Sequence, residues 1–438
     1  MRSGPLLFLA LVAVAPLGAQ EPSAAPAPSV LTLADALKRA LAANPGIGRS
    51  RADVDAAQSE VGVAFSSILP KINFKGAYTR NDRQVTFGSG KDAVTILPEN
   101  DWNYRLTLSQ PIYAGNRERK ALQQARLSVE SFRQGLRNAE DVLILNVTAD
   151  YLGVLEAEDL LSVEQKNLDL AQRRREQAQV FFDTGETTRV DLLRSEADIK
   201  AAERRLAGAR QTREAAVGRL RLDLAMEGPI AVQAPQSLFA ARPSETDLVA
   251  AAQASRPEVV QALANLESAR LEVAKQRNAR LPLVTADGAW IKQASAFPAD
   301  QYAQLTLNFS VPIFDSGEIK GKVAVAEDRR RQAELAVQEI KQSVREQVHQ
   351  ALVDLETAEA NLRLSTEQLA ASQAESDQAT EFYRAQELTA LEAQQAATSL
   401  ADARRTVASS KLDRDIAELK VWAAAGLLKK TVPLEGAP

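Results

Sequence analysis

Few residues in this sequence are of the types that carry out enzyme chemistry. The 438-residue chain has no cysteine and one histidine, His349, which lies within a helix-forming stretch. The sequence has neither a His-Glu-x-x-His helix nor a Cys/His cluster with metal-ligand spacing, and Phe87-Gly88-Ser89-Gly90 is typical of a flexible surface loop. Because no catalytic constellation is present, we expect a protein that is not an enzyme and that binds no cofactor and no metal.

The charged residues are numerous but spread out. Lys and Arg total 53 and Asp and Glu total 57, which gives a formal net charge of -4. Nucleic acid requires a concentrated basic face, so we expect no nucleic-acid partner. The simplest interpretation of the charged runs is that they form solvated helix faces, as in Arg173-Arg174-Arg175-Glu176 and Arg329-Arg330-Arg331. Aromatic residues make up only 5%, and a chain dominated by Ala, Leu, Glu, Gln and Arg favours long packed helices.

The N-terminus has the pattern of a secretory signal. Arg2 precedes an apolar run from Leu6 to Ala15, and Leu17-Gly18-Ala19 is a small-residue cleavage site. A retained membrane anchor is the alternative, but Pro5 and Pro16 bound a run shorter than the ~20 apolar residues that a spanning helix needs. No later apolar run has that length. A membrane protein with this sequence would therefore cross the bilayer with strands.

The chain is an internal duplication. Asn44-Pro45 recurs as Arg256-Pro257 at an offset of 212 (257 − 45), whereas Pro111 recurs as Pro312 at an offset of 201 (312 − 111). The difference of 11 residues fits a longer loop in the first copy, between Arg80 and Asp101. We expect a signal peptide at 1–19, a flexible lead at 20–30, a first repeat at 31–225, an inter-repeat segment at 226–246, a second repeat at 247–426 and a tail at 427–438.

Each copy is predicted to be a helix, two strands, a long helix and a return helix. The first helix is expected from Thr32 to Ser67. The stretch from Asn116 to about Phe182 contains no proline, and a helix of that length extends ~100 Å. Its counterpart runs from Glu318 to about Ala385. Such helices need partners for their apolar stripes, which the return helices supply with coiled-coil spacing. Prolines are expected to mark the strand–helix transitions: Pro70, Pro111, Pro282 and Pro312.

Four segments alternate between apolar and polar residues with a period of two. They lie at 71–80, 102–110, 283–292 and 302–311. Each has about the ~9–11 residues that cross a bilayer as a tilted strand, with the apolar side outward and the polar side inward. A pair of soluble hairpins with one face on a core is the alternative, which alternation alone does not exclude. Four strands cannot close a barrel, and open edges in lipid leave backbone groups unpaired, so strands in a membrane must be pooled between subunits.

The order of these features resembles the TolC-type outer-membrane efflux channels, also called outer membrane factors. The resemblance covers nearly all of the chain after the signal. Each motif is weak alone, but the motifs occur in order and most are duplicated. They are Asn44-Pro45, Leu69-Pro70, Gln110-Pro111-Ile112-Tyr113, Ala149-Asp150-Tyr151-Leu152-Gly153-Val154-Leu155, Gly185-Glu186-Thr187-Thr188-Arg189-Val190-Asp191-Leu192-Leu193 and Val311-Pro312-Ile313-Phe314-Asp315.

The resemblance implies a mainly α fold with a transmembrane β-barrel contribution. Three subunits would form a homotrimer, with a twelve-stranded barrel in the outer membrane of a Gram-negative-type cell and a long α-helical periplasmic barrel. The implied function is that of a passive exit duct for efflux or secretion, which docks to a periplasmic adaptor and an inner-membrane pump. A soluble periplasmic coiled-coil adaptor or structural tether is the alternative. A channel would require detergent, and a tether would not.

The resemblance also places a gate at the two helix–helix turns, near Asp183 to Thr188 and Arg384 to Thr389. By motif position, Asp191 and Glu392 match the acidic residue after each turn, and Tyr383 matches the tyrosine before the second turn. We hypothesise that Tyr383 bonds Asp191 in the closed state and that Glu392 lines the constriction, where a ring of carboxylates would favour cations. The acidic residues of the turns join this candidate gate: Asp183, Glu186 and Glu387.

Three residues at or beside the turns depart from the family pattern. Leu388 stands where some relatives have a basic latch residue, and Arg194 replaces a second acid in the first copy. Gln386 occupies a position that is often glycine. The ion-pair part of the latch is therefore expected to be missing or rearranged. Asp191 also has a simpler role open to it, because an Asp in the first turn commonly caps a helix.

Overall fold

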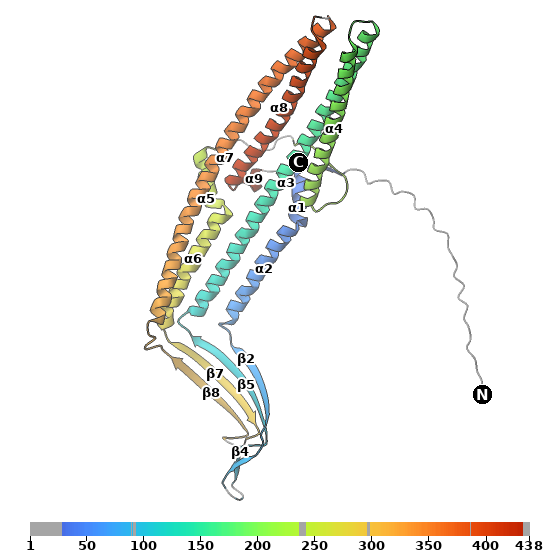
Figure 1. Ribbon diagram of the computed structural model, residues 1–438. Coiled ribbons are helices and arrows are strands. Elements are labelled where there is room, and N and C mark those ends of the chain that lie inside the picture. The colour runs from blue at the N-terminus through green and yellow to red at the C-terminus, as the bar shows by residue number, and fades with distance from the viewer. Residues whose placement is uncertain are drawn as a thin grey trace, which may run out of the picture.

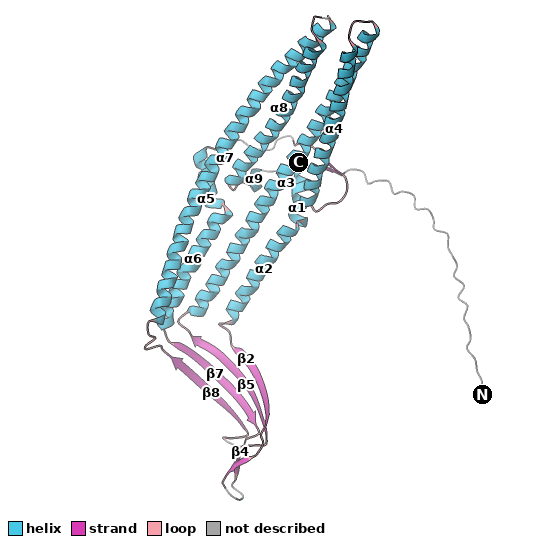
Figure 2. Ribbon diagram, in the orientation of Figure 1, coloured by secondary structure: helices cyan, strands magenta, loops and turns pink. Residues whose placement is uncertain are grey.

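The computed structural model describes residues 29–431 except 89, 91–92, 236–241, 296–297 and 386. The expected signal peptide at 1–19, residues 20–28 of the lead and residues 432–438 of the tail lie outside the described residues. The molecule is elongated, with a bundle of long helices above a curved sheet at one end (Figure 1). Helix dominates the fold, as Figure 2 shows by colour.

The duplication is visible in the long helices. Helix α3 (Arg117–Asp183) and helix α7 (Glu318–Arg384) each have 67 residues, and α7 begins 201 residues after α3 (318 − 117). The return helices α4 (Arg189–Asp223) and α8 (Ala390–Ala424) each have 35 residues and the same offset (390 − 189). The predicted duplicated repeat is thus confirmed. The hairpin of α3 and α4 and the hairpin of α7 and α8 lie side by side (Figure 1).

Shorter helices precede the strands of each copy. They are α1 (Leu33–Ala43) and α2 (Pro45–Ser66) in the first copy, then α5 (Glu245–Ser255) and α6 (Pro257–Arg277) in the second. A 3₁₀ turn at Asn278–Arg280 extends α6, and α9 (Leu428–Thr431) follows α8.

The expectation of one continuous helix from Thr32 to Ser67 is wrong, because the chain breaks at Asn44. Pro45 disfavours the helical conformation in the residue before it, and Asn44 is extended, with φ -66° and ψ 124°. The Asn44 side chain accepts a hydrogen bond from the backbone N–H of Gly46 at 2.8 Å, and Pro45 begins the next helix. The same break separates α5 from α6 at Arg256, directly before Pro257.

Four strands form one antiparallel sheet in the order β2-β5-β7-β8. Their bounds are β2 Lys71–Arg80, β5 Asn100–Tyr113, β7 Leu283–Gln293 and β8 Gln301–Ser310. Within the described residues, β2 and β8 each pair along one side only, so the sheet has two open edges.

The register places most of the apolar residues of the four strands on one face. Phe74 pairs with Leu106, Leu106 pairs with Trp290, and Trp290 pairs with Ala303. The opposite face is polar, as in the row where Asn73 pairs with Thr107. Large apolar side chains on the apolar face are solvent-exposed in the single chain: Ile72, Phe74, Leu305, Leu307 and Phe309.

Three of the four prolines lie between a strand and a helix, and Pro111 lies within a strand. Pro70 and Pro282 directly precede β2 and β7, and Pro312 follows the end of β8 at Ser310. The expected end of the second strand at residue 110 is wrong, since β5 continues to Tyr113 and includes Pro111. The register shifts between Pro111 and Tyr113, and such an irregularity accommodates a residue without a backbone N–H.

The longer loop of the first copy contains a small hairpin. Strand β3 (Val85–Phe87) pairs antiparallel with β4 (Val94–Leu97) between β2 and β5. This hairpin accounts for the 11 residues by which the two copies differ, and it projects beyond the main sheet (Figure 1).

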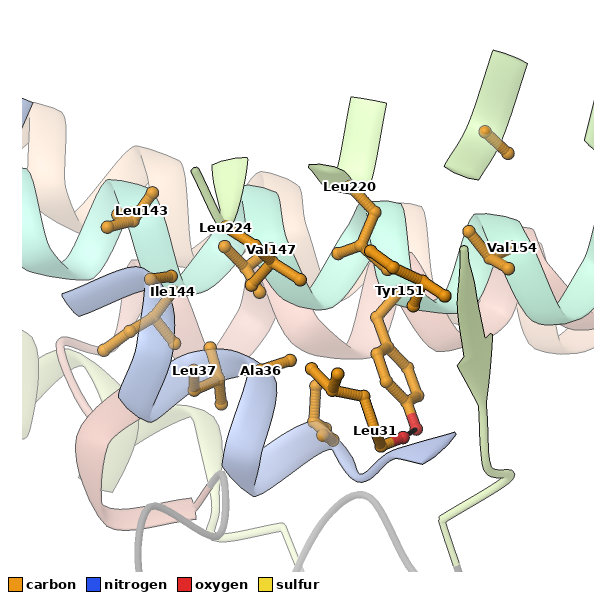
Figure 3. Packing of buried hydrophobic residues seen from close by; sticks show 14 of the residues in the cluster. Leu31, Ala36, Leu37, Leu143, Ile144, Val147, Tyr151, Val154, Leu220 and Leu224 are labelled. Carbon is orange, nitrogen blue, oxygen red and sulfur yellow. Dashed lines mark hydrogen bonds between the residues drawn. The ribbon is translucent and has the colours of Figure 1, made fainter. Parts of the chain in front are cut away.

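The largest core lies midway along the helices. Strands β1 (Ser29–Leu31) and β6 (Ile230–Val232) form a parallel pair that packs near α1, α3 and α4. Tyr151 of α3 is fully buried there, and its hydroxyl donates a hydrogen bond to the Leu31 carbonyl at 2.9 Å (Figure 3). The hydroxyl also contacts the Gln233 carbonyl at 2.5 Å and accepts from the Gln233 N–H at 3.0 Å. Tyr151 therefore ties the N-terminal strand and the inter-repeat segment to a long helix.

No helix among the described residues combines the length and the apolar character needed to cross a membrane.

Candidate functional site

The two helical hairpins end together at the end of the molecule opposite the sheet (Figure 1). Residues 184–188 connect α3 to α4, and residues 385–389 connect α7 to α8. Gly185 has φ +77°, a conformation that glycine adopts without strain, and it reverses the chain after α3. Thr188 and Thr389 are the N-caps of the return helices. Both return helices therefore begin with a threonine N-cap.

Asp191 lies in the first turn of α4 and is held by its cap. Its Oδ2 accepts hydrogen bonds from the hydroxyls of Thr188 at 2.7 Å and Thr187 at 3.1 Å, and its backbone N–H donates to Thr188 Oγ1 at 3.3 Å. Arg194 approaches Oδ1 at 3.5 Å. The Thr188 hydrogen bond, with smaller contributions from Thr187 and Arg194, lowers the pKa of Asp191 below the usual range of aspartate. The carboxylate is therefore charged at neutral pH.

Glu392 occupies the matching position in α8 and forms a capping box with Thr389. Its Oε2 accepts from the Thr389 hydroxyl at 2.7 Å and from the Thr389 backbone N–H at 3.0 Å. These hydrogen bonds lower the pKa of Glu392. Glu392 therefore stabilises the start of α8, and its side chain remains exposed to solvent.

Tyr383 joins the two tips. Its ring meets the edge of Phe181 from the other copy, with ring centroids 5.9 Å apart and planes at 66°. Tyr383 and Asp191 both line an open cavity of about 570 Å³ between the tips. Burial raises the pKa of the Tyr383 hydroxyl, and the charge of Asp191 raises it further. Within the described residues the structure has no hydrogen bond between Tyr383 and Asp191, so the two groups are neighbours without being bonded.

The remaining acidic residues of the candidate gate are exposed at the tips. Asp183 accepts a hydrogen bond from Gln179 Nε2 at 2.8 Å, Glu186 lies in the first turn, and the Glu387 N–H donates to the Phe382 carbonyl at 2.9 Å. Gln386, which departs from the family pattern, lies outside the described residues.

A polar seam between the two copies was not predicted from the sequence. Gln394 of α8 donates to Asp198 of α4 at 2.5 Å. Farther from the tip, Glu164 of α3 pairs with Arg405 of α8 at 2.5 Å and with Arg205 of α4 at 3.7 Å. The Glu164 side chain is only 4% exposed. The sequence holds a signal for the unusual position of Glu164, although not for its partners. An apolar stripe with three-and-four spacing includes this carboxylate: Leu161, Glu164, Leu168 and Ala171.

Arg174 belongs to the same seam, nearer the tip. Burial lowers the pKa of its guanidinium, while Asp198 and Tyr383 raise it. Arg174 also lines a smaller cavity of about 180 Å³ together with Tyr383 and Asp191. A cation from the first copy therefore lies beside the tyrosine of the second copy.

Solved structures share this fold. The chain is similar to the crystal structure of CusC, described for folding and transmembrane channel formation, with a TM-score of 0.78, 18% identity and coverage of 90% of this chain and 92% of that chain. It is also similar to the open state of the Neisseria gonorrhoeae MtrE outer membrane channel, with a TM-score of 0.74, 20% identity and coverage of 90% and 89%. The fold is therefore that of outer-membrane channels, mainly helical with a β-barrel contribution.

Sequence comparison points to the same class. The Brucella suis outer membrane efflux protein BepC is 26% identical over 412 residues, which is 90% of this chain and 85% of that protein. The Escherichia coli outer membrane protein TolC is 21% identical over 411 residues, which is 90% and 82%. The model of the outer membrane efflux protein family matches residues 36–225 and again residues 248–427.

This chain belongs to the outer membrane efflux protein family. It is an outer-membrane channel with a long periplasmic helical extension, and its family consists of channel proteins rather than enzymes. Membership favours the channel over the alternative of a soluble periplasmic adaptor or tether.

Proposed function

We propose that three copies of this chain form a homotrimer whose pooled strands close a twelve-stranded barrel (three times the four strands of the sheet). The open edges of β2 and β8 are the observation that carries this proposal, because unpaired backbone groups in lipid cost several kcal/mol each. The apolar face supports it, since Leu305 is 82% exposed in the single chain and suits outer-membrane lipid.

The assembled helices would continue the barrel as a tunnel through the periplasm. In this proposal residues 1–19 direct export and are removed, and the repeats at 31–225 and 247–426 supply the tunnel wall. The part of the inter-repeat segment near Pro229 to Ser244 would form a girdle around the tunnel together with the two termini. The subunit is a passive duct. A periplasmic adaptor and an inner-membrane pump dock at the helical tips, and the pump supplies the energy. Similarity to the Pseudomonas aeruginosa alkaline protease secretion protein AprF, at 28% identity over 308 residues, makes secretion a second use beside efflux.

The tips form the gate in this proposal. Tyr383 lies beside Asp191 at the junction of the two hairpins, and rotation of its hydroxyl toward the carboxylate would latch them in the closed state. Glu392 would line the constriction, with Asp183, Glu186 and Glu387 adding to the acidic rim. Tyr383→Phe combined with Asp191→Ala is expected to raise single-channel conductance, and unchanged conductance would show that no latch is present.

The trimer is tested by the protein mass of the purified mature chain, measured by light scattering with and without detergent. A detergent-dependent particle of three chains, which precipitates when detergent is removed, supports the pooled barrel. A monomer or dimer that stays soluble without detergent contradicts it.

A further inference from the structure

Two cations lie directly opposite each other on the polar face of the sheet. Lys75 of β2 and Arg105 of β5 are register partners, and both side chains are exposed. Neither takes part in an ion pair within the described part of the chain. Like charges in directly opposite positions of an antiparallel pair are destabilising, so this arrangement carries a cost that the fold alone does not explain.

The rest of the row brings no compensating charge. Arg105 pairs on its other side with Ile291 of β7, which is buried, and Ile291 pairs with Tyr302 of β8. The row from β2 to β8 therefore reads Lys75, Arg105, Ile291 and Tyr302, with two positive charges and no negative charge.

The carboxylates of this face lie in other rows. Asp101 is four residues from Arg105 toward the hairpin end, and Asp287 is four residues from Ile291 toward the helices. Four residues along a strand span ~13 Å, which exceeds the screening length of ~8 Å at physiological salt. Asp287 also has its own partner, since Asn308 Nδ2 donates to it at 2.5 Å. Neither carboxylate neutralises the Lys75–Arg105 row.

We infer that Lys75 and Arg105 form an anion-binding ring inside the barrel. The inference rests on the proposed trimer, because the apolar face with Phe74 and Leu106 turns to lipid and the opposite face then lines the lumen. Three subunits place six cations at one level of the exit path (three times the two of the row). Rings of Lys and Arg are how pores select anions and phosphates. The ligand class is multivalent anions that carry phosphate or carboxylate groups, which guanidinium and ammonium groups bind well.

The test measures block of the trimeric channel in a planar bilayer by tripolyphosphate, added on the side of the β3–β4 hairpin. Wild-type protein is expected to be blocked. The double variant Lys75→Gln, Arg105→Gln should need a tripolyphosphate concentration about ten-fold or more higher for half block, because it removes six positive charges from the lumen of the trimer. Lys75→Arg keeps the charge and should keep the block.

Lys292→Gln is the matched control for the single variant Arg105→Gln. Lys292 pairs with Tyr104, so it lies on the apolar side of the same sheet, and each variant removes one charge per subunit. Block should weaken in Arg105→Gln and persist in Lys292→Gln.

Three results would overturn the inference of an anion-binding ring. They are a conducting wild-type channel that tripolyphosphate does not block, a double variant that is blocked as strongly as wild type, or a loss of block in Lys292→Gln equal to that in Arg105→Gln. A wild-type protein that forms no trimer and no channel is a different outcome, since it overturns the proposed function on which the ring rests.

Discussion

Glu164 and Arg405 come from different copies of the repeat and lie 241 residues apart in sequence, yet their side chains meet at 2.5 Å. Glu164 is on α3 and Arg405 is on α8, so this ion pair fastens the first hairpin to the second. The carboxylate is almost fully buried and also accepts from Asn167 Nδ2 at 3.3 Å. Burial by itself would lower the pKa of Arg405, but Glu164 and then Asp402 raise it above its usual value.

Removal of the Glu164 charge should loosen the contact between the hairpins. Glu164→Gln is expected to lower the free energy of unfolding by about 2–3 kcal/mol, because Arg405 and Arg205 lose a buried partner. Thermal denaturation followed by circular dichroism measures the change. Lys200→Gln is the control, since Lys200 pairs with Glu203 at an exposed site and should cost about 0.5 kcal/mol or less. If both variants lower the melting temperature by the same amount, the buried Glu164 ion pair contributes no more to stability than the exposed pair of Lys200.

The hydroxyl of Tyr151 should be necessary to hold the N-terminal strand β1 in the core that lies midway along the helices. Tyr151→Phe keeps the ring but leaves the Leu31 carbonyl without this buried donor, at a cost of about 1–3 kcal/mol. The N-terminal strand should then become accessible to protease before the helices unfold. Limited proteolysis with mass spectrometry detects that cleavage. If the variant resists protease as wild type does, Tyr151 acts by packing alone.

Asp150 and Asp223 should make stability fall as pH rises. Burial raises the pKa of both carboxyls. At Asp223 the negative charge of Asp150 and then a hydrogen bond to it raise the pKa further, whereas that hydrogen bond lowers the pKa of Asp150, the pattern of a pair that shares a proton. A carboxyl whose pKa is higher in the folded state favours folding below its unfolded pKa of ~4, and this benefit is lost as pH rises through the folded pKa.

Asp223→Asn should therefore be more stable than wild type at pH 7 and should show a flatter dependence of melting temperature on pH. A melting series between pH 4 and pH 8 tests both effects. An identical pH dependence in the two proteins would contradict the shared proton.

The two faces of the sheet should respond differently to the same substitution. Leu305→Arg places a charge on the apolar face and is expected to cost about 2–4 kcal/mol in a lipid bilayer. Thr306→Arg, one residue further along β8, places it on the polar face and should be close to neutral. Folding into lipid vesicles, followed by electrophoretic mobility, compares the two. The assignment of faces is wrong if Thr306→Arg is the more damaging variant.

Much of this fold could be predicted because its signals are local. Proline spacing reveals the duplication, and alternation of apolar and polar residues locates the strands and their faces. The break at Asn44 is harder to predict, because alanine-rich sequence on both sides favours one continuous helix while a single proline, Pro45, opposes it.

The candidate site could be predicted less completely. A helix-capping role for Asp191 is one of the two roles that the sequence predicts, because it depends only on neighbours in sequence. The N-cap residues themselves, Thr188 and Thr389, were not predicted. The pairing of Glu164 with Arg405 depends on which helices lie side by side, and no spacing in one chain encodes that contact.

The most direct test of the channel is current through a planar bilayer that contains the purified, detergent-extracted trimer. Wild-type protein is expected to give discrete conductance steps of uniform size, and the Tyr383→Phe, Asp191→Ala variant is expected to give larger ones. If protein that is trimeric by mass and inserted in the bilayer gives no steps, in wild type and in the variant alike, the account of this chain as an outer-membrane duct is wrong.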